Sequence, residues 1–280
     1  MVTRYAVRLF ANAAEFLART GSWLQSREDE NSIVLSVATA LTSGDSPFRE
    51  PLYFASIEEA GRLLGCAIAA TPDGLELTDL PADVAPLLVA SAVRLRPELP
   101  WVAGPRRASL DFAKAWASEL GGTWKLSEEW IEFRLDEIVA PRSVPGRLRL
   151  AEPSDWPELR AWARDYGDAA AGTIDVTGFF ELRLRRRELH VWDHDGPKCC
   201  VAISGRTPHS LRVSAVYTPR PLRGRGYASN TVAAASRHAL ASGAKFCVVF
   251  AHREPSQPAR IYRSVGYRPV RDHLLIALAR

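Results

Sequence analysis

The stretch YTPRPLRGRGYASNTVAAASRHAL, Tyr217 to Leu240, decides the fold because it joins two kinds of secondary structure through glycines and arginines. The alternating residues that lead into it, Leu211–Tyr217, predict a strand, and the alanine-rich run from Ser229 predicts a helix. The first amides of a helix have no intrahelical acceptor and carry the positive end of the helix dipole. A loop that leads from a strand into a helix in this way is therefore a candidate anion site.

The glycines and arginines of this loop suit a diphosphate. Gly224 and Gly226 carry no Cβ, so they let the backbone turn tightly and approach a ligand. Positive charge comes from three arginines: Arg220, Arg223 and Arg225. A Walker loop does not fit, because it needs Lys-Ser/Thr after its last glycine. A dinucleotide fingerprint does not fit either, because it needs an acid about 20 residues on, and residues 196–253 contain no Asp or Glu.

The composition is that of an ordinary globular protein with an uneven charge distribution. The 280 residues, 47% hydrophobic and 24% charged, suffice for two domains of the usual size. Residues 1–145 carry 14 basic and 20 acidic side chains, a net charge of −6, whereas residues 146–280 carry 22 and 12, a net charge of +10. All six histidines lie in the second part. An anionic ligand and titrating chemistry are therefore expected there.

Neither a membrane span nor a metal site is predicted. No apolar run approaches the roughly 20 residues of a membrane helix. The cysteines lack zinc-ligand spacing, and they are expected to be buried thiols in a reducing cytoplasm; they are Cys66, Cys199, Cys200 and Cys247. The basic start, residues 1–20, is compatible with a transit peptide but is better interpreted as a short strand followed by a helix.

Proline and glycine cluster in APRSVPGR, residues 140–147, and predict a linker. It divides the chain into a first domain over residues 1–140 and a second over 146–280. The second half predicts a short strand, a helix, another helix over Thr177–Leu189 and then three strands. The first half repeats this pattern. Two explanations stay open, a tandem duplication and chance similarity between two domains.

The loop and its surroundings resemble the acetyl-coenzyme-A loop of the GNAT superfamily of N-acetyltransferases. The family motif, Arg/Gln-x-x-Gly-x-Gly/Ala after the fourth strand, is matched by Arg223–Ala228. The family order of elements fits residues 147–280, and Gln257–Tyr267 ends in the family pattern Tyr-x-x-x-Gly-Phe/Tyr. The resemblance implies an α+β fold of tandem GNAT-like mixed sheets, mostly antiparallel and flanked by helices.

The resemblance also implies a cofactor, acetyl-CoA (coenzyme A), and the backbone that holds it. Three strand-end residues would pair with the pantetheine arm: Val216, Tyr217 and Thr218. Loop and helix amides would hold the pyrophosphate: Arg223, Gly224, Arg225, Gly226, Tyr227, Ala228 and Ser229. The side chain of Arg220 stays open between a ligand contact and a solvated residue.

For catalysis, the resemblance implies a tyrosine near the cofactor sulfur as general acid, and Tyr262 matches that position. The alternative for Tyr262 is a core aromatic. An asparagine that family members often carry three residues earlier is replaced here by Ala259. Because the fourth and fifth strands carry no carboxylate, the candidate bases are His252 and Glu254, unless ordered water removes the proton.

The first half lacks these features. Trp116 stands in the place of Tyr262. The helix that follows the third strand of this half opens on Pro81, without a glycine loop before it. The resemblance therefore implies a degenerate acetyltransferase-like first domain, which would shape the acceptor pocket, and a catalytic second domain. The expected activity is N-acetyl transfer to a small-molecule or peptide amine in the cytoplasm. The alternative is a coenzyme-A-binding pseudoenzyme that acts as a sensor or an interaction module.

Other partners are not supported by the sequence. The basic run Arg183–Arg187 falls on a predicted helix, where charge usually marks a solvated face, and no aromatic residues interleave it. Nucleic-acid binding and membrane binding are therefore not expected. A homodimer stays open, and no motif identifies the acceptor amine.

Overall fold

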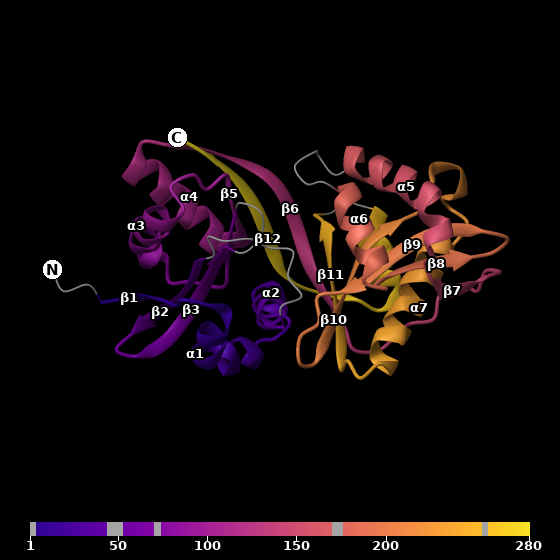
Figure 1. Cartoon of the computed structure of the whole chain (residues 1–280), viewed down its shortest axis with the longest axis horizontal. Coiled ribbons are helices and arrows are strands. Elements are labelled where there is room, and N and C mark those ends of the chain that lie inside the picture. Colours follow the sequence, from indigo (N-terminus) through magenta and orange to yellow (C-terminus); the bar gives the residue numbers. More distant parts are fainter. Residues whose placement is uncertain (1–3, 44–52, 70–73, 170–175, 254–256) are drawn as a thin grey trace. The chain divides into compact units, whose positions relative to one another are not determined.

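The computed structural model describes residues 4–43, 53–69, 74–169, 176–253 and 257–280 (Figure 1). These residues form two compact units. The first unit comprises Met1–Glu132 together with Val270–Arg280, and the second comprises Phe133–Pro269. This division differs from the boundary that the linker predicts, 1–140 and 146–280, in two places: the second unit begins at Phe133, and most of the last strand of the chain belongs to the first unit. That strand is the last element of the second repeat in sequence.

The first repeat alternates strands and helices. Its elements are β1 (Ala6–Leu9), α1 (Ala13–Ser26), α2 (Ser32–Thr42), β2 (Tyr53–Glu59), β3 (Arg62–Ala69), β4 (Leu75–Leu77), α3 (Ala85–Leu95), β5 (Trp101–Pro105), α4 (Arg106–Leu120) and β6 (Thr123–Leu135). Local chemistry fixes several of these boundaries. Helix α1, for example, begins after Asn12, whose side chain accepts a hydrogen bond from the Glu15 amide at 2.9 Å. The strand and helix predicted for the start of the chain are thereby confirmed.

The second repeat has the same order of elements. They are β7 (Arg147–Leu150), α5 (Trp156–Ala169), α6 (Val176–Arg185), β8 (Leu189–Asp193), β9 (Pro197–Ser204), β10 (Ser210–Tyr217), α7 (Tyr227–Ala241), β11 (Phe246–His252), α8 (Gln257–Val265) and β12 (Arg268–Ala279). Strand, two helices, three strands, helix, strand, helix and strand therefore occur twice. The predicted α+β fold with two mixed sheets flanked by helices is confirmed.

Each unit contains a mostly antiparallel sheet. In the first unit the strand order is β1-β2-β3-β4-β5-β12-β6, and in the second it is β11-β10-β9-β8-β7. One parallel pair occurs in each described sheet, β4 with β5 and β10 with β11. Strand β12 lies antiparallel to β5, from His273 opposite Pro105 to Ala277 opposite Trp101. Sequence periodicity predicts that β12 is a strand but cannot tell which sheet it joins.

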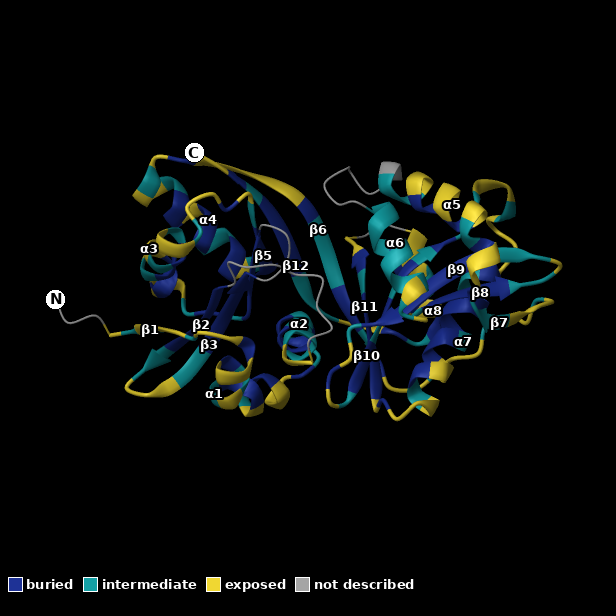
Figure 2. Cartoon of the chain, in the orientation of Figure 1, coloured by how far each residue is buried: buried dark blue, intermediate teal, exposed yellow. Residues whose placement is uncertain are grey.

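Helices cover both faces of each sheet, and most of the strands between them are buried (Figure 2). In the first unit, α3 and α4 pack Leu88, Phe112 and Trp116 on one face, and α1 and α2 cover the other. In the second unit, α5 and α6 contribute Trp162 and Phe180 to one face, and α7 covers the other. Full burial of one such side chain contributes about 2–3 kcal/mol. These cores hold the strand ends of each unit in place.

All four cysteines are buried free thiols, as predicted from the sequence. Burial raises the pKa of Cys199 to about 11 and that of Cys247 to about 12. Both thiols therefore stay protonated at neutral pH. Within the described residues, no helix has the length and apolar character to cross a membrane.

A buried ion pair in the first unit sets a test of this fold. Glu132 of β6 is fully buried, and its carboxylate accepts hydrogen bonds from Arg271 Nε at 3.0 Å and Ser32 Oγ at 2.9 Å. Arg271→Met removes the guanidinium that pairs with this buried carboxylate. We expect the free energy of unfolding to fall by about 2–3 kcal/mol, measured by urea denaturation.

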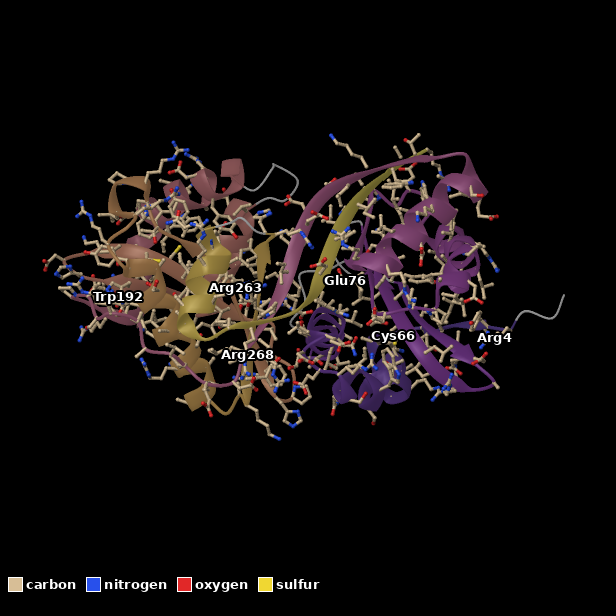
Figure 3. The ribbon with its side chains drawn as sticks, turned by 180° about the vertical axis from the view of Figure 1, so that it is seen from behind. Arg4, Cys66, Glu76, Trp192, Arg263 and Arg268 are labelled. Atoms are coloured by element: carbon tan, nitrogen blue, oxygen red, sulfur yellow. The ribbon has the colours of Figure 1, made fainter. Side chains whose placement is uncertain are left out.

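The matched control is Arg268→Met, at the exposed start of the same strand (Figure 3). It also removes an arginine side chain, but one that pairs with no buried carboxylate among the described residues. The free energy of unfolding should therefore change by no more than about 0.5 kcal/mol. Equal losses in the two variants would show that the Arg271–Glu132 pair contributes nothing specific.

Candidate active site

The site begins where β10 and β11 stop pairing. These parallel strands are joined at three residue pairs, from Ser210 opposite Phe246 to Arg212 opposite Val248. Both strands continue, β10 to Tyr217 and β11 to His252, but the described residues contain no further pairs between them. The backbone groups that follow therefore border an opening between two neighbouring strands. An extended ligand can enter such an opening by pairing with a strand edge.

A β-bulge in β10 gives this opening a local cause. The register of β10 against β9 shifts between Ser214 and Tyr217, and Ala215 between them has φ of +51°. One additional residue bends a strand and increases its twist. The left-handed conformation is costly for a residue other than glycine, and such outliers concentrate at functional sites. The bulge bends β10 at its C-terminal end, where it no longer pairs with β11.

The residues at this strand end point to opposite faces. The side chain of Val216 packs beside Trp192 and Cys199, on the face that also includes Tyr227 of α7. The side chain of Tyr217 is buried with Trp162 on the face covered by α5 and α6. Tyr217 thereby anchors the end of β10.

The loop after β10 turns into α7 through two glycines. A short 3-10 turn over Arg220–Leu222 leads to Gly224 and Gly226, with φ of +75° and +84°. These left-handed conformations need glycine or a small polar residue. A Cβ at Gly224 would meet open space, whereas a Cβ at Gly226 would lie 2.9 Å from Val144 of the linker. Gly226 is therefore fixed by close packing as well as by its φ.

The first turn of α7 presents amides to this loop. Asn230 N donates to Gly226 O at 3.2 Å and closes the first helical turn. Within the described residues, α7 has no side-chain cap at its N-terminus. The amides of Tyr227, Ala228 and Ser229 come before that first bond, and they are the groups that an anion can satisfy. Ala228 and Ser229 are half-buried, and the tyrosine ring is buried below them.

The linker fixes the position of this helix start. Asn230 Nδ2 donates to the carbonyl of Arg142 at 2.9 Å and to that of Gly226 at 2.9 Å. The Tyr227 hydroxyl lies 3.3 Å from His194 Nδ1. Side chains on α7 therefore tie the loop to the linker and to the turn after β8.

The arginines of the loop are exposed, and one of them folds back. Arg223 Nε donates to the carbonyl of Thr218 at 3.0 Å, and its guanidinium lies 5.8 Å from the centre of the Tyr217 ring. The side chain of Arg223, the first residue of the motif, thus bonds back to the start of the loop. The backbone amide of Arg223 is part of the same loop. Arg220 and Arg225 are exposed beside it. Guanidinium groups stay charged at neutral pH, so the loop is positive.

Tyr262 is buried on α8, with 5% of its surface exposed. Its ring lies 6.3 Å from that of Phe133 and 5.7 Å from that of Tyr267. Burial strongly raises the pKa of Tyr262, and smaller contributions come from Tyr166 and Cys199. The phenol therefore keeps its proton at neutral pH, and its hydroxyl is within electrostatic reach of α5 and β9.

The two predicted bases are only partly placed. His252 is exposed at the end of β11. Glu254 lies outside the described residues. Ala259, at the position where the resemblance would favour asparagine, is fully buried on α8. Among the described residues, no group of three histidine, cysteine or acidic side chains could hold a metal ion.

Solved structures match this arrangement over the whole chain. A GCN5-related N-acetyltransferase from Sphaerobacter thermophilus matches over 99% of this chain and 96% of its own, with a TM-score of 0.61 at 15% identity. A tandem GNAT protein from the clavulanic acid biosynthesis pathway matches over 98% of both chains, with a TM-score of 0.52 at 13% identity.

The chain has a tandem GNAT fold. A Drosophila protein of known structure is also similar, with a TM-score of 0.69 at 10% identity over 98% of both chains. No family model and no curated protein sequence matches the chain. At these identities the likeness establishes the fold.

The first GNAT unit lacks the loop that the second unit has. Strand β4 pairs in parallel with β5 at two positions, and β10 pairs in parallel with β11 at three. The residues that follow it, Thr78–Val84, contain two aspartates and no glycine or arginine. Trp116 is buried on α4, and its Nε1 donates to the carbonyl of Ala279 at 3.3 Å. The tryptophan therefore has a packing role within this unit.

Sequence reasoning missed a carboxylate in the second GNAT unit. Asp165, in the last turns of α5, accepts a hydrogen bond from the Tyr217 hydroxyl at 2.9 Å, and it is exposed. Tyr166 beside it packs against Tyr217, with ring centres 6.4 Å apart. Burial raises the pKa of Tyr217, and the Asp165 contact raises it further. In the sequence, Asp165 is marked only by its place three residues after Trp162, at the edge of the helix face that packs on the core.

Proposed function

We propose that the second unit binds acetyl-CoA and transfers its acetyl group to an amine. The proposal rests on three features of the second unit: a parallel strand pair that stops, uncapped helix amides after a glycine loop, and a buried tyrosine whose pKa is raised by burial. Bound acetyl-CoA supplies a thioester carbonyl to the attacking amine. The GNAT fold of the chain supports acyl transfer in general.

The residues present fit the diphosphate of coenzyme A. The amides of Tyr227 to Ser229 would hold its oxygens, and the exposed guanidinium of Arg225 adds charge-assisted contacts. Gly224 carries no Cβ, so the loop backbone is open to a ligand at that point. Backbone groups of Val216 to Thr218 would hold the pantetheine arm along the edge of β10.

We assign Tyr262 the role of general acid. Its Oη atom holds a proton at neutral pH, because burial raises the pKa of the phenol. Such a proton can be donated to a sulfur that gains negative charge. His252 and Glu254 remain the candidate bases that the sequence supplies, with ordered water as the alternative.

We further propose that Asp165 receives the acceptor amine. Its carboxylate is exposed on α5 and is joined to the strand end through Tyr217. A carboxylate at this place attracts a cationic ammonium group and can accept a proton from it. The neighbouring half-buried ring of Tyr166 offers an apolar surface for the rest of the acceptor.

The test of the function is release of free thiol from acetyl-CoA in the presence of a panel of small-molecule and peptide amines. Thiol release that depends on an amine, with formation of the acetylated amine detected by mass spectrometry, is the expected result. Tight binding of acetyl-CoA without turnover on any amine would support the second candidate, a coenzyme-A-binding pseudoenzyme. The absence of a carboxylate from residues 196–253 favours that candidate. Failure to bind acetyl-CoA would refute both.

Asp165→Asn gives a prediction for the acceptor side. We expect the KM for a cationic amine to rise about tenfold, because a charge-assisted contact is lost. The Kd for acetyl-CoA, measured by calorimetry, should not change. Glu158→Gln is the matched control, since it removes an exposed charge from the first turn of the same helix. If both variants raise the KM equally, a general charge effect explains the result and Asp165 has no specific role.

A further inference from the structure

The second unit contains a cavity far from the loop that joins β10 to α7, residues 218–226, which the proposed function makes the donor loop. Its volume is about 500 Å³, within the usual range of small-ligand sites. Residues of β7, β8, β9 and β10 line it, together with His238 and Ser242 at the end of α7. Helix α7 has 15 residues and begins at the donor loop with Tyr227. Since a helix rises about 1.5 Å per residue, the cavity lies about 20 Å from that loop.

Arg187, at the rim of this cavity, has an unfavourable backbone conformation. Its φ is +56°, and it is the second residue after the end of α6. Glu188 N donates to Arg183 O at 2.8 Å and Arg187 N to Leu184 O at 3.0 Å, which is the helix ending that usually has glycine at this position. An arginine here strains the backbone where glycine would not. The side chain of Arg187 is therefore a candidate for function.

The cavity has an excess of positive charge. Arg149 is neutralised by Asp155, at 2.7 Å, and by Asp193, at 3.1 Å. Another lining residue, Glu188, is neutralised by Arg183, at 2.5 Å. The other two lining arginines, Arg187 and Arg206, are exposed, and neither has an acidic partner among the described residues.

Two histidines complete the polar lining. His190 is 7% exposed, and its Nδ1 atom is buried without a hydrogen-bond partner among the described residues. Burial, with a smaller contribution from the nearby His238, lowers the pKa of His190 to about 4. The two rings lie 5.3 Å apart. A neutral His190 can donate one hydrogen bond into the cavity, and the exposed His238 can add another.

We propose that this cavity binds a small organic anion with an apolar body. The charged group would lie between Arg187 and Arg206, within reach of the histidines. The apolar part would pack on Leu148, Ile203 and Leu211, which line the same cavity. Carboxylates and phosphate monoesters share this chemistry, since guanidinium groups bind both through paired hydrogen bonds.

The probes are hexanoate and hexyl phosphate, with hexylamine as the opposite-charge control, each titrated into the full chain by calorimetry. We expect at least one anion to bind and hexylamine not to bind. Arg187→Gly should weaken anion binding about tenfold while leaving the midpoint of thermal unfolding unchanged or higher, because glycine relieves the strained φ. A role in folding alone would not give this combination.

Two further variants make the result decisive. Arg185→Gln removes an exposed arginine of α6 that contacts Glu181 at 3.3 Å, and it should leave anion binding unchanged. Arg225→Gln tests for binding at the donor loop. Binding lost in Arg225→Gln but kept in Arg187→Gly would overturn the proposal, as would equal binding of hexylamine or no binding of either anion.

Discussion

Replacing Tyr262 with phenylalanine is expected to reduce amine-dependent thiol release by about 100- to 1,000-fold, while the Kd for acetyl-CoA changes less than threefold. The variant removes one oxygen atom from a buried ring and keeps the contacts with Phe133 and Tyr267. General acid catalysis typically contributes factors of this size. The measurement is the turnover number at saturating amine, together with calorimetry of acetyl-CoA binding.

Ser264→Ala is the matched control for Tyr262→Phe. It also removes one hydroxyl from α8, but Ser264 is exposed and bonds only locally, to the Ile261 carbonyl at 2.7 Å. Its turnover should equal that of the native chain. Native turnover in Tyr262→Phe would leave Tyr262 as a core aromatic, which is the other interpretation that the sequence allows.

Changing Gly224 to aspartate is expected to weaken acetyl-CoA binding about 100-fold, whereas Gly224→Asn should weaken it less than tenfold. Both residues tolerate a left-handed backbone better than other side chains do, and a Cβ at this position meets open space. The two variants are almost the same size, so the difference between them isolates one negative charge beside a bound diphosphate. Calorimetry with acetyl-CoA measures both Kd values.

Gly196→Asp controls for the introduction of an aspartate into a turn. Gly196 also has a positive φ and open space around its Cβ position, but it lies in the turn between β8 and β9. Native affinity is expected there. If the Asp and Asn variants at Gly224 bind acetyl-CoA equally well, the loop does not hold the diphosphate.

The order of elements was predictable because local chemistry sets it. The turn at Asp195-Gly196 is an example, since both residues adopt the positive φ that Asp-Gly sequences favour. The loop with Gly224 and Gly226 is another. In both places a few adjacent residues determine the backbone, so a single sequence contains the necessary information.

The end of α6 was wrongly predicted. The sequence Thr177–Leu189 favours a continuous helix, but α6 ends at Arg185, and Leu189 begins β8. The signal for such an ending is glycine, and the chain has Arg187 in its place. Tertiary packing of the strand overrides the local preference there.

The sequence indicates the candidate site only where a motif marks it. Tyr262 and the donor loop carry the motifs, whereas Asp165 does not. The bond between Asp165 and Tyr217 joins residues 52 positions apart, and no local pattern predicts such a contact. Site residues that are defined by contacts between segments distant in sequence can be identified only from the structure.

The membership of Val270–Arg280 in the first unit has a consequence for how the protein is made. In that unit, β12 occupies the place between β5 and β6. During synthesis from the N-terminus, the first sheet therefore stays open until almost the entire second repeat has been translated. The first repeat therefore cannot mature as an independent module, because a loop of more than 130 residues must close before its sheet is complete. Such closure over a long sequence separation slows folding. The unpaired strand edge of the first sheet is therefore accessible to chaperones for a long time.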